Sequence, residues 1–322
     1  TRFVIRRLPG PRAKRHVALQ SWNACVRIRG SARRVDVRGL RGHAAHAQDH
    51  QGHPLPRHHH RAEDLPAGER AGQGDLRDRP AVADAIEAVG DADLVVEAVF
   101  ERLDLKMQVF RELDALCPPR TILASNTSTH LPSLLATATR RPDKVLVAHY
   151  FYPPSLLPLV EIVPGRETSP ETVAAVYELM KAVGKSPIVV EKEAYGFIAN
   201  RLQFALQREA LFIVEQGIAS AQDVDTAVRD GFGRRLAVAG PFEIAEPIGW
   251  DLELMIQEYL LPHLANSPEP SDLLVEKVRR GELGMKSGKG FYEWTAESAE
   301  AWRQGMSKAL AQMASRAEAL PR

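Results

Sequence analysis

The chain has 322 residues, with 42 Lys and Arg against 41 Asp and Glu, so its formal net charge is only +1. The length allows two domains, and the balanced charge points to no particular partner. Its two cysteines, Cys25 and Cys117, exclude a disulfide scaffold and fit a reducing, cytoplasmic compartment. No run of about 18 apolar residues occurs, so we expect no membrane partner.

Residues 1–80 differ from the rest, with 17 basic residues against seven acidic ones and eight of the eleven histidines. Short apolar triplets such as Phe3-Val4-Ile5 and Ala24-Cys25-Val26 do not extend into a helical or strand period, so we expect irregular structure. The composition fits a flexible tail, a basic arm that binds nucleic acid, or metal binding by the His-rich run 43–60. The spacing needed for either binding function is absent, so we predict no nucleic-acid partner and no metal.

From about residue 81 helices and strands alternate. Helices are predicted over 81–89, 103–116 and 131–137, and strands over 93–99, 121–124 and 145–148. This order is typical of an α/β fold with a parallel sheet and crossover helices. Ligands bind at the carboxyl ends of such strands. The ends of these strands carry residues 97–101, 125–128 and His149, so we expect these residues at that edge of the sheet.

The strand over 145–148 is followed by His149, a proline-containing turn and a second apolar run that carries Glu161. This pattern predicts two strands, or a strand and an extended segment, whose ends lie close. A carboxylate against an imidazole orients the ring and raises its basicity, which suits removal of a proton from an alcohol. The alternative is a surface histidine at a strand end and an unrelated glutamate.

A helix over 170–183, capped by Ser169, and a strand over 186–190 complete the α/β part. After residue 192 the pattern is all-helical, and the first helix ends at Gly217, a C-cap glycine. We therefore predict an all-α part over 193–295 and a C-terminal helix over 296–322. The remaining helices are predicted over 197–216, 222–229, 242–247, 250–264 and 271–280.

Several motifs occur in a fixed order along the chain. They are DADLVVEAVFERLDLK (91–106), ASNTST (124–129), GKSPIVVEKEAYGFIANRLQ (184–203), GPFEIAEPIGWD (240–251) and GELGMKSGKGFYEW (281–294). With them, residues 91–294 resemble the L-3-hydroxyacyl-CoA dehydrogenases and their short-chain relatives, the 3-hydroxybutyryl-CoA, L-carnitine and L-gulonate 3-dehydrogenases. The resemblance implies NAD as cofactor, a small-molecule 3-hydroxyacyl-CoA or 3-hydroxy acid as substrate, and a homodimer.

The same resemblance implies the site residues. The positions that match catalytic residues are His149, Glu161, Ser128 and Asn200. The positions that match cofactor-binding residues are Ala98, Glu101, Lys106, Asn126 and Ser128. Three alternatives remain: Ser128 satisfies backbone donors in its turn, Asn200 is a buried amide, and Glu101 and Lys106 form an ordinary solvated helix start.

Two departures from the family stand out. Tyr152 replaces an asparagine of the family's HFFNP motif, and the residues that follow lean toward the carnitine and gulonate relatives. The family's opening strand, G-x-G-x-x-G loop and helix, which bind the pyrophosphate, have no counterpart in residues 1–80. We therefore expect an incomplete Rossmann-like parallel sheet with exposed edges and weak or no NAD binding.

Two hypotheses follow from the second departure. The chain could be a catalytically impaired dehydrogenase that acts only as a helical dimerisation module. The Arg, Ala, Gly, Pro and His excess of residues 1–79 also fits a high-GC gene read in the wrong frame. Sequencing the locus tests that origin, because an intact frame with no strand–GxGxxG–helix in a neighbouring frame contradicts it.

Overall fold

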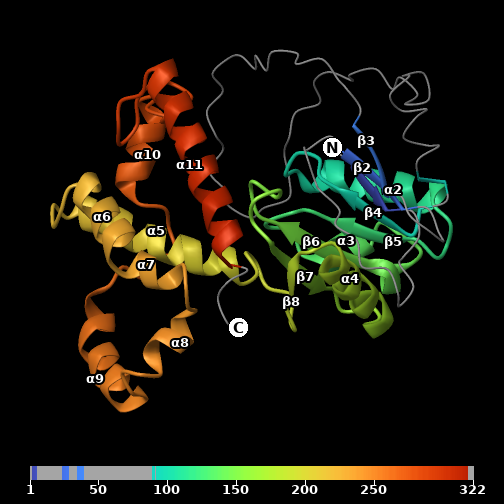
Figure 1. Ribbon diagram of the computed structural model, residues 1–322, viewed down its shortest axis with the longest axis horizontal. Helices are drawn as coiled ribbons and strands as arrows, with labels where there is room; N and C mark the ends of the chain where they lie inside the picture. Colours follow the sequence, from blue (N-terminus) through green and yellow to red (C-terminus); the bar gives the residue numbers. More distant parts are fainter. Residues whose placement is uncertain (1, 6–23, 29–34, 40–88, 91, 318–322) are drawn as a thin grey trace, which may run out of the picture. The chain divides into compact units, whose positions relative to one another are not determined.

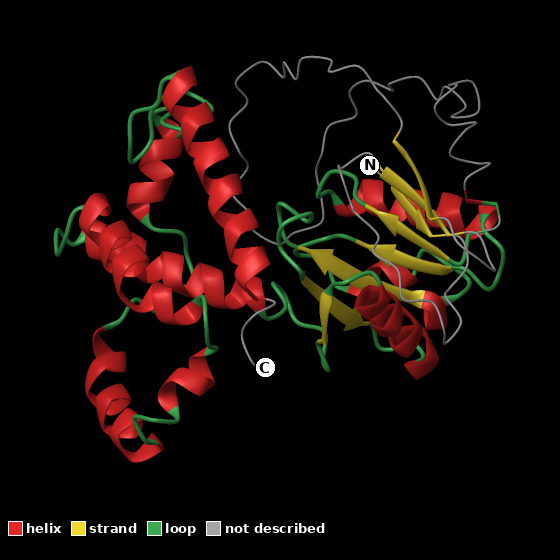
Figure 2. Cartoon of the chain, in the orientation of Figure 1, coloured by secondary structure: helices red, strands yellow, loops and turns green. Residues whose placement is uncertain are grey.

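The computed structural model describes residues 2–5, 24–28, 35–39, 89–90 and 92–317. The chain divides into two compact units, Thr1–Ala194 and Tyr195–Arg322, and the division falls close to the expected boundary at residue 192. The first unit combines a sheet with helices, and the second is helical (Figure 1). Figure 2 shows that the first unit contains strands together with helices, and that the second unit contains helices and loops.

The main sheet of the first unit has six strands in the order β1-β4-β5-β6-β7-β8. Their bounds are β1 (Arg2–Ile5), β4 (Leu94–Glu97), β5 (Ile122–Ser125), β6 (Val145–Tyr150), β7 (Leu159–Pro164) and β8 (Ser186–Val189). The strands β4, β5 and β6 run parallel, as predicted. β7 turns back antiparallel to β6, and β8 is parallel to β7. The sheet is therefore Rossmann-like in its centre but mixed overall, because the second apolar run forms a hairpin with the first.

The described residues of the range 1–80 form three short strands, which differs from the expected irregular structure. β2 (Ala24–Ile28) and β3 (Val35–Gly39) form a separate antiparallel pair. β1 pairs antiparallel with β4 and covers the edge that we expected to be open. Both quoted apolar triplets fall in strands, and segments of four or five residues are too short to display a period. The His-rich run 43–60 and the helix predicted over 81–89, apart from Val89, lie outside the described residues.

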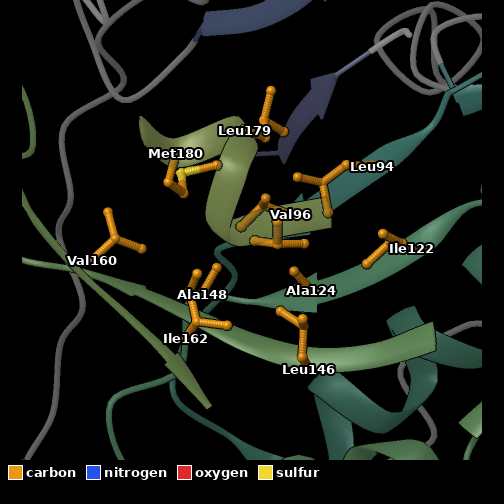
Figure 3. Close-up of a cluster of buried hydrophobic side chains, with 11 residues drawn as sticks. Leu94, Val96, Ile122, Ala124, Leu146, Ala148, Val160, Ile162, Leu179 and Met180 are labelled. Carbon is orange, nitrogen blue, oxygen red and sulfur yellow. The ribbon is translucent and has the colours of Figure 1, made fainter. Parts of the chain in front are cut away.

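Helices pack on both faces of the main sheet. They are α2 (Leu103–Leu116), with the predicted bounds, α3 (Pro132–Ala136), η2 (Pro142–Lys144) and α4 (Pro170–Ala182). Successive strand side chains alternate between faces, so Val95 packs with Phe110 of α2. Leu94 and Val96 belong instead to the cluster that contains Met180 of α4 (Figure 3). These two apolar layers fix where β4, β5 and β6 end.

Helix capping agrees with the sequence at two places. The Ser169 side chain accepts a hydrogen bond from Thr172 N at 3.2 Å at the start of α4. Gly217 follows α5 (Ala199–Glu215) with a φ of 67°, the left-handed conformation of a C-cap glycine. Both sites limit their helices as predicted.

The second unit is built from helices of very different lengths. They are α5 (Ala199–Glu215), α6 (Ala221–Ala227), η3 (Val228–Phe232), α7 (Gly233–Leu236), α8 (Pro241–Ala245), α9 (Trp250–Leu260), η4 (Leu261–His263), α10 (Asp272–Arg279) and α11 (Ala296–Ala317). The helix predicted over 250–264 is split, because Pro262 lies in the 3-10 turn η4. Neither α5 nor α9 has a buried residue. Within the described residues, no helix has the length and apolar character needed to cross a membrane.

Candidate active site

The carboxyl ends of β4, β5 and β6 meet at one edge of the sheet and carry polar side chains. Glu97, the last residue of β4, lies in register with Ser125, the last residue of β5. Ser125 is in turn in register with Val147 of β6, two residues before His149. The sheet therefore brings the three predicted polar segments together.

His149 and Glu161 face each other directly across the β6–β7 ladder. His149 Nδ1 lies 2.7 Å from Glu161 Oε2, and the two side chains are 5% and 0% exposed. A carboxylate only accepts hydrogen bonds, so the imidazole proton belongs on Nδ1 and the lone pair on Nε2. The predicted proximity is confirmed, and the alternative of a surface histidine beside an unrelated glutamate is wrong. The ring of Phe151 lies 4.8 Å from that of His149, tilted by 60°.

Ser128 meets the opposite side of the imidazole. Its Oγ lies 3.0 Å from His149 Nε2. Two of the backbone donors of the turn bond to Thr127 Oγ1, which accepts hydrogen bonds from Thr129 N at 3.2 Å and His130 N at 3.0 Å. The turn-capping role considered for Ser128 is thus taken by its neighbour.

Asn126 joins two strand ends. Its Oδ1 accepts a hydrogen bond from Tyr150 N at 2.9 Å, and its own backbone N–H donates to Glu97 O at 2.8 Å. The residue therefore links the segment after β5 to the ends of β4 and β6. These two hydrogen bonds hold the start of the turn that carries Ser128 in place.

A buried ion pair lies beside this turn. Lys106 and Glu97 are 1% and 0% exposed, with Nζ 3.2 Å from Glu97 Oε1. Lys106 Nζ also lies 3.2 Å from Glu101 Oε2 and donates to Val99 O at 3.3 Å. Glu97 accepts further hydrogen bonds from Ser125 Oγ and from Val99 N. The solvated helix start considered for Lys106 is wrong, because its ammonium group is enclosed by carboxylates and a carbonyl.

Glu97 was not among the predicted site residues. A signal was available, since a carboxylate inside an apolar strand is costly to bury without a partner. The matching cation, Lys106, is nine residues further on. Pairing these two residues from the sequence requires knowing that α2 returns to the end of β4.

Glu101 lies at the outer side of the cluster, with its side chain 39% exposed. Partial burial acts to raise the pKa of Glu101, but hydrogen bonds from Thr127 and Thr129 and the charge of Lys106 outweigh it and lower the pKa to about 2. The carboxylate is therefore ionised at neutral pH. It is the most accessible charge of the cluster.

Two predicted site residues, Ala98 and Asn200, do not take part in the hydrogen bonds described above. Ala98 directly follows β4 and is half-buried. Asn200 belongs to the second unit, where it is half-buried near the start of α5. In the described ranges no group of three or more His, Cys, Asp or Glu is placed to hold a metal ion.

Comparisons with known proteins agree with this fold. The family model "3-hydroxyacyl-CoA dehydrogenase, NAD binding domain" matches residues 59–194, and the model of the C-terminal domain matches residues 196–294. The first match begins inside the range 1–80, where we had found no motif of the family. It leaves the preceding residues unmatched.

Individual relatives cover most of the chain. The 5-formyl-3-hydroxy-2-methylpyridine 4-carboxylate 5-dehydrogenase of Mesorhizobium japonicum is 34% identical over 240 residues, 74% of this chain and 77% of the relative. The 3-hydroxybutyryl-CoA dehydrogenase of Clostridioides difficile is 37% identical over 209 residues, 65% of this chain and 73% of the relative. The L-carnitine dehydrogenase of Streptomyces coelicolor is 44% identical over 170 residues, 52% of this chain and 54% of the relative.

A solved structure has the same architecture. The structure of a 5-formyl-3-hydroxy-2-methylpyridine 4-carboxylic acid 5-dehydrogenase, described as an NAD+-dependent dismutase, superposes with a TM-score of 0.70 at 34% identity. The similarity covers 71% of this chain and 74% of that structure. The chain therefore belongs to the 3-hydroxyacyl-CoA dehydrogenase family of NAD-dependent oxidoreductases.

Proposed function

We propose that this oxidoreductase converts an L-3-hydroxyacyl-CoA, or a small L-3-hydroxy acid, to the 3-keto product with His149 as general base. The observation that carries the proposal is the arrangement of Glu161, His149 and Ser128. Glu161 holds Nδ1, so the basic nitrogen Nε2 is directed at Ser128 Oγ, 3.0 Å away. An alcohol bound beside Ser128 would lie within reach of that nitrogen.

NAD supplies the hydride acceptor when it is bound. The residues we propose to hold it are Ala98, Glu101, Lys106, Asn126 and Ser128. Their chemistry fits a hydroxyl-rich cofactor, because the ionised and partly exposed Glu101 can accept hydrogen bonds from sugar hydroxyls. The small side chain of Ala98 leaves room beside the end of β4.

Each residue has a distinct task in the proton transfer. Ser128 orients the substrate hydroxyl, and His149 receives its proton at Nε2. The resulting imidazolium is stabilised by Glu161, whose carboxylate lies 2.7 Å from Nδ1. We further propose that Asn200 hydrogen-bonds the substrate carbonyl. Neutral hydroxyl and amide groups suit this work since they do not compete for the proton.

Tyr152, which is 73% exposed, stands where the family's motif has asparagine. The residues that follow it, Pro153-Pro154 and Leu157–Glu161, resemble those of the carnitine and gulonate relatives, so we propose a small 3-hydroxy acid of that kind as substrate. The carnitine relative described above is consistent with this preference. Comparing L-carnitine, L-gulonate and 3-hydroxybutyryl-CoA as substrates tests it.

We propose that the second unit forms a homodimer and that the protein is cytoplasmic. Large apolar side chains are exposed on two of its helices. They are Leu202, Phe204 and Leu206 of α5 and Leu252, Leu254, Met255, Ile256 and Tyr259 of α9. A second copy of the chain would remove this apolar area from water. The low cysteine content supports a reducing compartment.

The test of the function is His149→Gln, which removes the base while leaving a polar side chain. We expect kcat to fall about 10²- to 10⁴-fold, with the melting temperature little changed. Exposed His263, in the second unit, gives the control variant His263→Gln. Turnover by His149→Gln within threefold of the parent protein would exclude His149 as the base.

A second candidate function is supported by the unmatched residues that precede residue 59. Without the glycine-rich unit the chain would bind NAD weakly and act as a dimerisation module. Calorimetry with NAD and gel filtration distinguish the two functions. A dimer with no turnover supports the module, whereas a micromolar dissociation constant for NAD contradicts it.

A further inference from the structure

The turn that carries Ser128 is anchored by one oxygen of one side chain. Glu101 Oε1 accepts hydrogen bonds from Ser128 N at 3.1 Å, Thr129 N at 3.1 Å and Thr129 Oγ1 at 2.8 Å. Thr127 Oγ1 donates to the same oxygen. Three consecutive residues therefore converge on a single carboxylate oxygen. Hydrogen bonds to an ionised acceptor are stronger than those to a neutral one.

The other oxygen of Glu101 is held from inside the protein. Its Oε2 lies 3.2 Å from Lys106 Nζ, whose side chain is 1% exposed. Lys106 is itself fixed by Glu97 and by the Val99 carbonyl. Glu101 thus connects a buried, immobile cation to a turn at the surface.

This connection ends at the imidazole. The backbone N–H of Ser128 donates to Glu101, while the hydroxyl of the same residue lies 3.0 Å from His149 Nε2. We propose that Glu101 is a positioning residue, which sets the position of Ser128 Oγ against His149 through the turn, besides any contact it makes with NAD. The expected effect of Glu101 on turnover rests on the proposed function, whereas its role in positioning Ser128 does not.

A double-mutant cycle separates positioning from cofactor contact. Glu101→Gln keeps the shape but weakens the anchor, and Lys106 keeps Glu97 as its partner, so the fold is retained. We expect kcat to fall about tenfold to a hundredfold. In a Ser128→Ala background the same substitution should change kcat less than about twofold, because the group that it positions is already gone.

The matched control is Asp104→Asn, in the first turn of α2 and three residues after Glu101. Asp104 is 67% exposed and pairs with Arg102, so the variant loses the same charge without touching the turn. It should leave kcat unchanged. If Glu101 acts only on the cofactor, Glu101→Gln raises KM for NAD equally in both backgrounds, and its effect on kcat adds to that of Ser128→Ala. That outcome overturns the positioning role.

Hydrogen–deuterium exchange tests the anchor without turnover. The amide N–H of Ser128 donates to Glu101, so its exchange should become at least tenfold faster in Glu101→Gln and stay unchanged in Asp104→Asn. The amide N–H of Thr129 also donates to Thr127 Oγ1, so its exchange should change less. Unchanged exchange in Glu101→Gln refutes the proposal. A parent protein that shows this exchange pattern but no turnover refutes the proposed function and leaves the anchor established.

Discussion

The two units treat charged and apolar side chains in opposite ways. In the first unit, Lys106 pairs with Glu97 at 1% and 0% exposure, and apolar layers cover both faces of the sheet. In the second, Glu276 pairs with Arg279 and Arg280 on the surface, and α5 and α9 bury no residue. The first unit thus has a buried apolar and charged interior, whereas the second exposes large apolar side chains on α5 and α9.

Breaking the buried ion pair gives the largest expected effect. Lys106→Met leaves the carboxylate of Glu97 buried without its cation, which should lower the free energy of unfolding by about 3–5 kcal/mol. Urea denaturation measures the loss. Adding Glu97→Gln should recover most of it, because no buried charge is then left alone.

The second unit offers the counterpart to that substitution. Arg280→Met removes one of two exposed partners of Glu276, and we expect no measurable change in the unfolding midpoint. Equal losses from Lys106→Met and Arg280→Met would mean that the two units do not differ in how they use charge.

Leu146 represents the apolar core of the first unit and is fully buried in the sheet. Leu146→Ala should lower the free energy of unfolding by about 2–5 kcal/mol, since it removes buried methyl groups and leaves a cavity. Its molecular mass by light scattering should be that of the parent protein. A change in oligomeric state would place part of the interface in the first unit.

A substitution on α9 is expected to affect association of two copies rather than folding. Leu254 is 59% exposed, so Leu254→Asp should leave each copy folded but weaken the proposed dimer by about tenfold or more. Sedimentation over a concentration series measures the dissociation constant. A dimer of unchanged affinity would mean that this face of α9 is not the interface.

The smallest expected effect concerns pH. The pKa of Glu101 is held at about 2, below its ordinary value of 4.5, by hydrogen bonds and Lys106 acting against burial. A lowered pKa contributes stability above pH 4.5 that is lost as the pH falls toward 2. The parent protein should therefore lose slightly more stability over this range than Glu101→Gln, slightly because the side chain is 39% exposed.

Salt sharpens this test. The pKa of Glu276 is also lowered to about 2, by hydrogen bonds from Arg279 and Arg280, but that cluster lies at the surface. At about 1 M salt the difference between the parent protein and Glu276→Gln should vanish, because exposed charges are screened. The difference for Glu101→Gln should remain. Loss of both differences would show that Glu101 is screened as fully as Glu276.

Much of the first unit follows from its sequence, and the reasons are local. The apolar spacing of α2 gave its bounds without error, and the proline-containing turn correctly brought His149 to Glu161. The burial of Lys106 could not be read locally, since it depends on how α2 returns to β4. The anchor from Glu101 was also missed, because its donors are about 26 residues away and look like ordinary turn residues.

The short strands near the N-terminus were missed for a different reason. β1 gains its partner, β4, from about ninety residues further along the chain, and its four residues carry no period. Pairing between distant segments is decided by the available edge rather than by propensity. In the second unit, by contrast, exposure of apolar residues on α9 could not be predicted from a helical pattern that looks like any core-facing helix.

The β6–β7 register has a consequence for how substrate preference can diverge. His149 and Glu161 are held by backbone pairing on either side of residues 151–158, and the ladder continues inward through Val147 and Val163. The connection is fastened separately, by Lys185 Nζ donating to the carbonyls of Pro154 and Leu157. Because backbone pairing sets the register of His149 against Glu161, residues of the connection can differ between relatives while that register is kept. The part of the hairpin in which we propose that specificity is set is in this way separate from the ladder that aligns the two side chains.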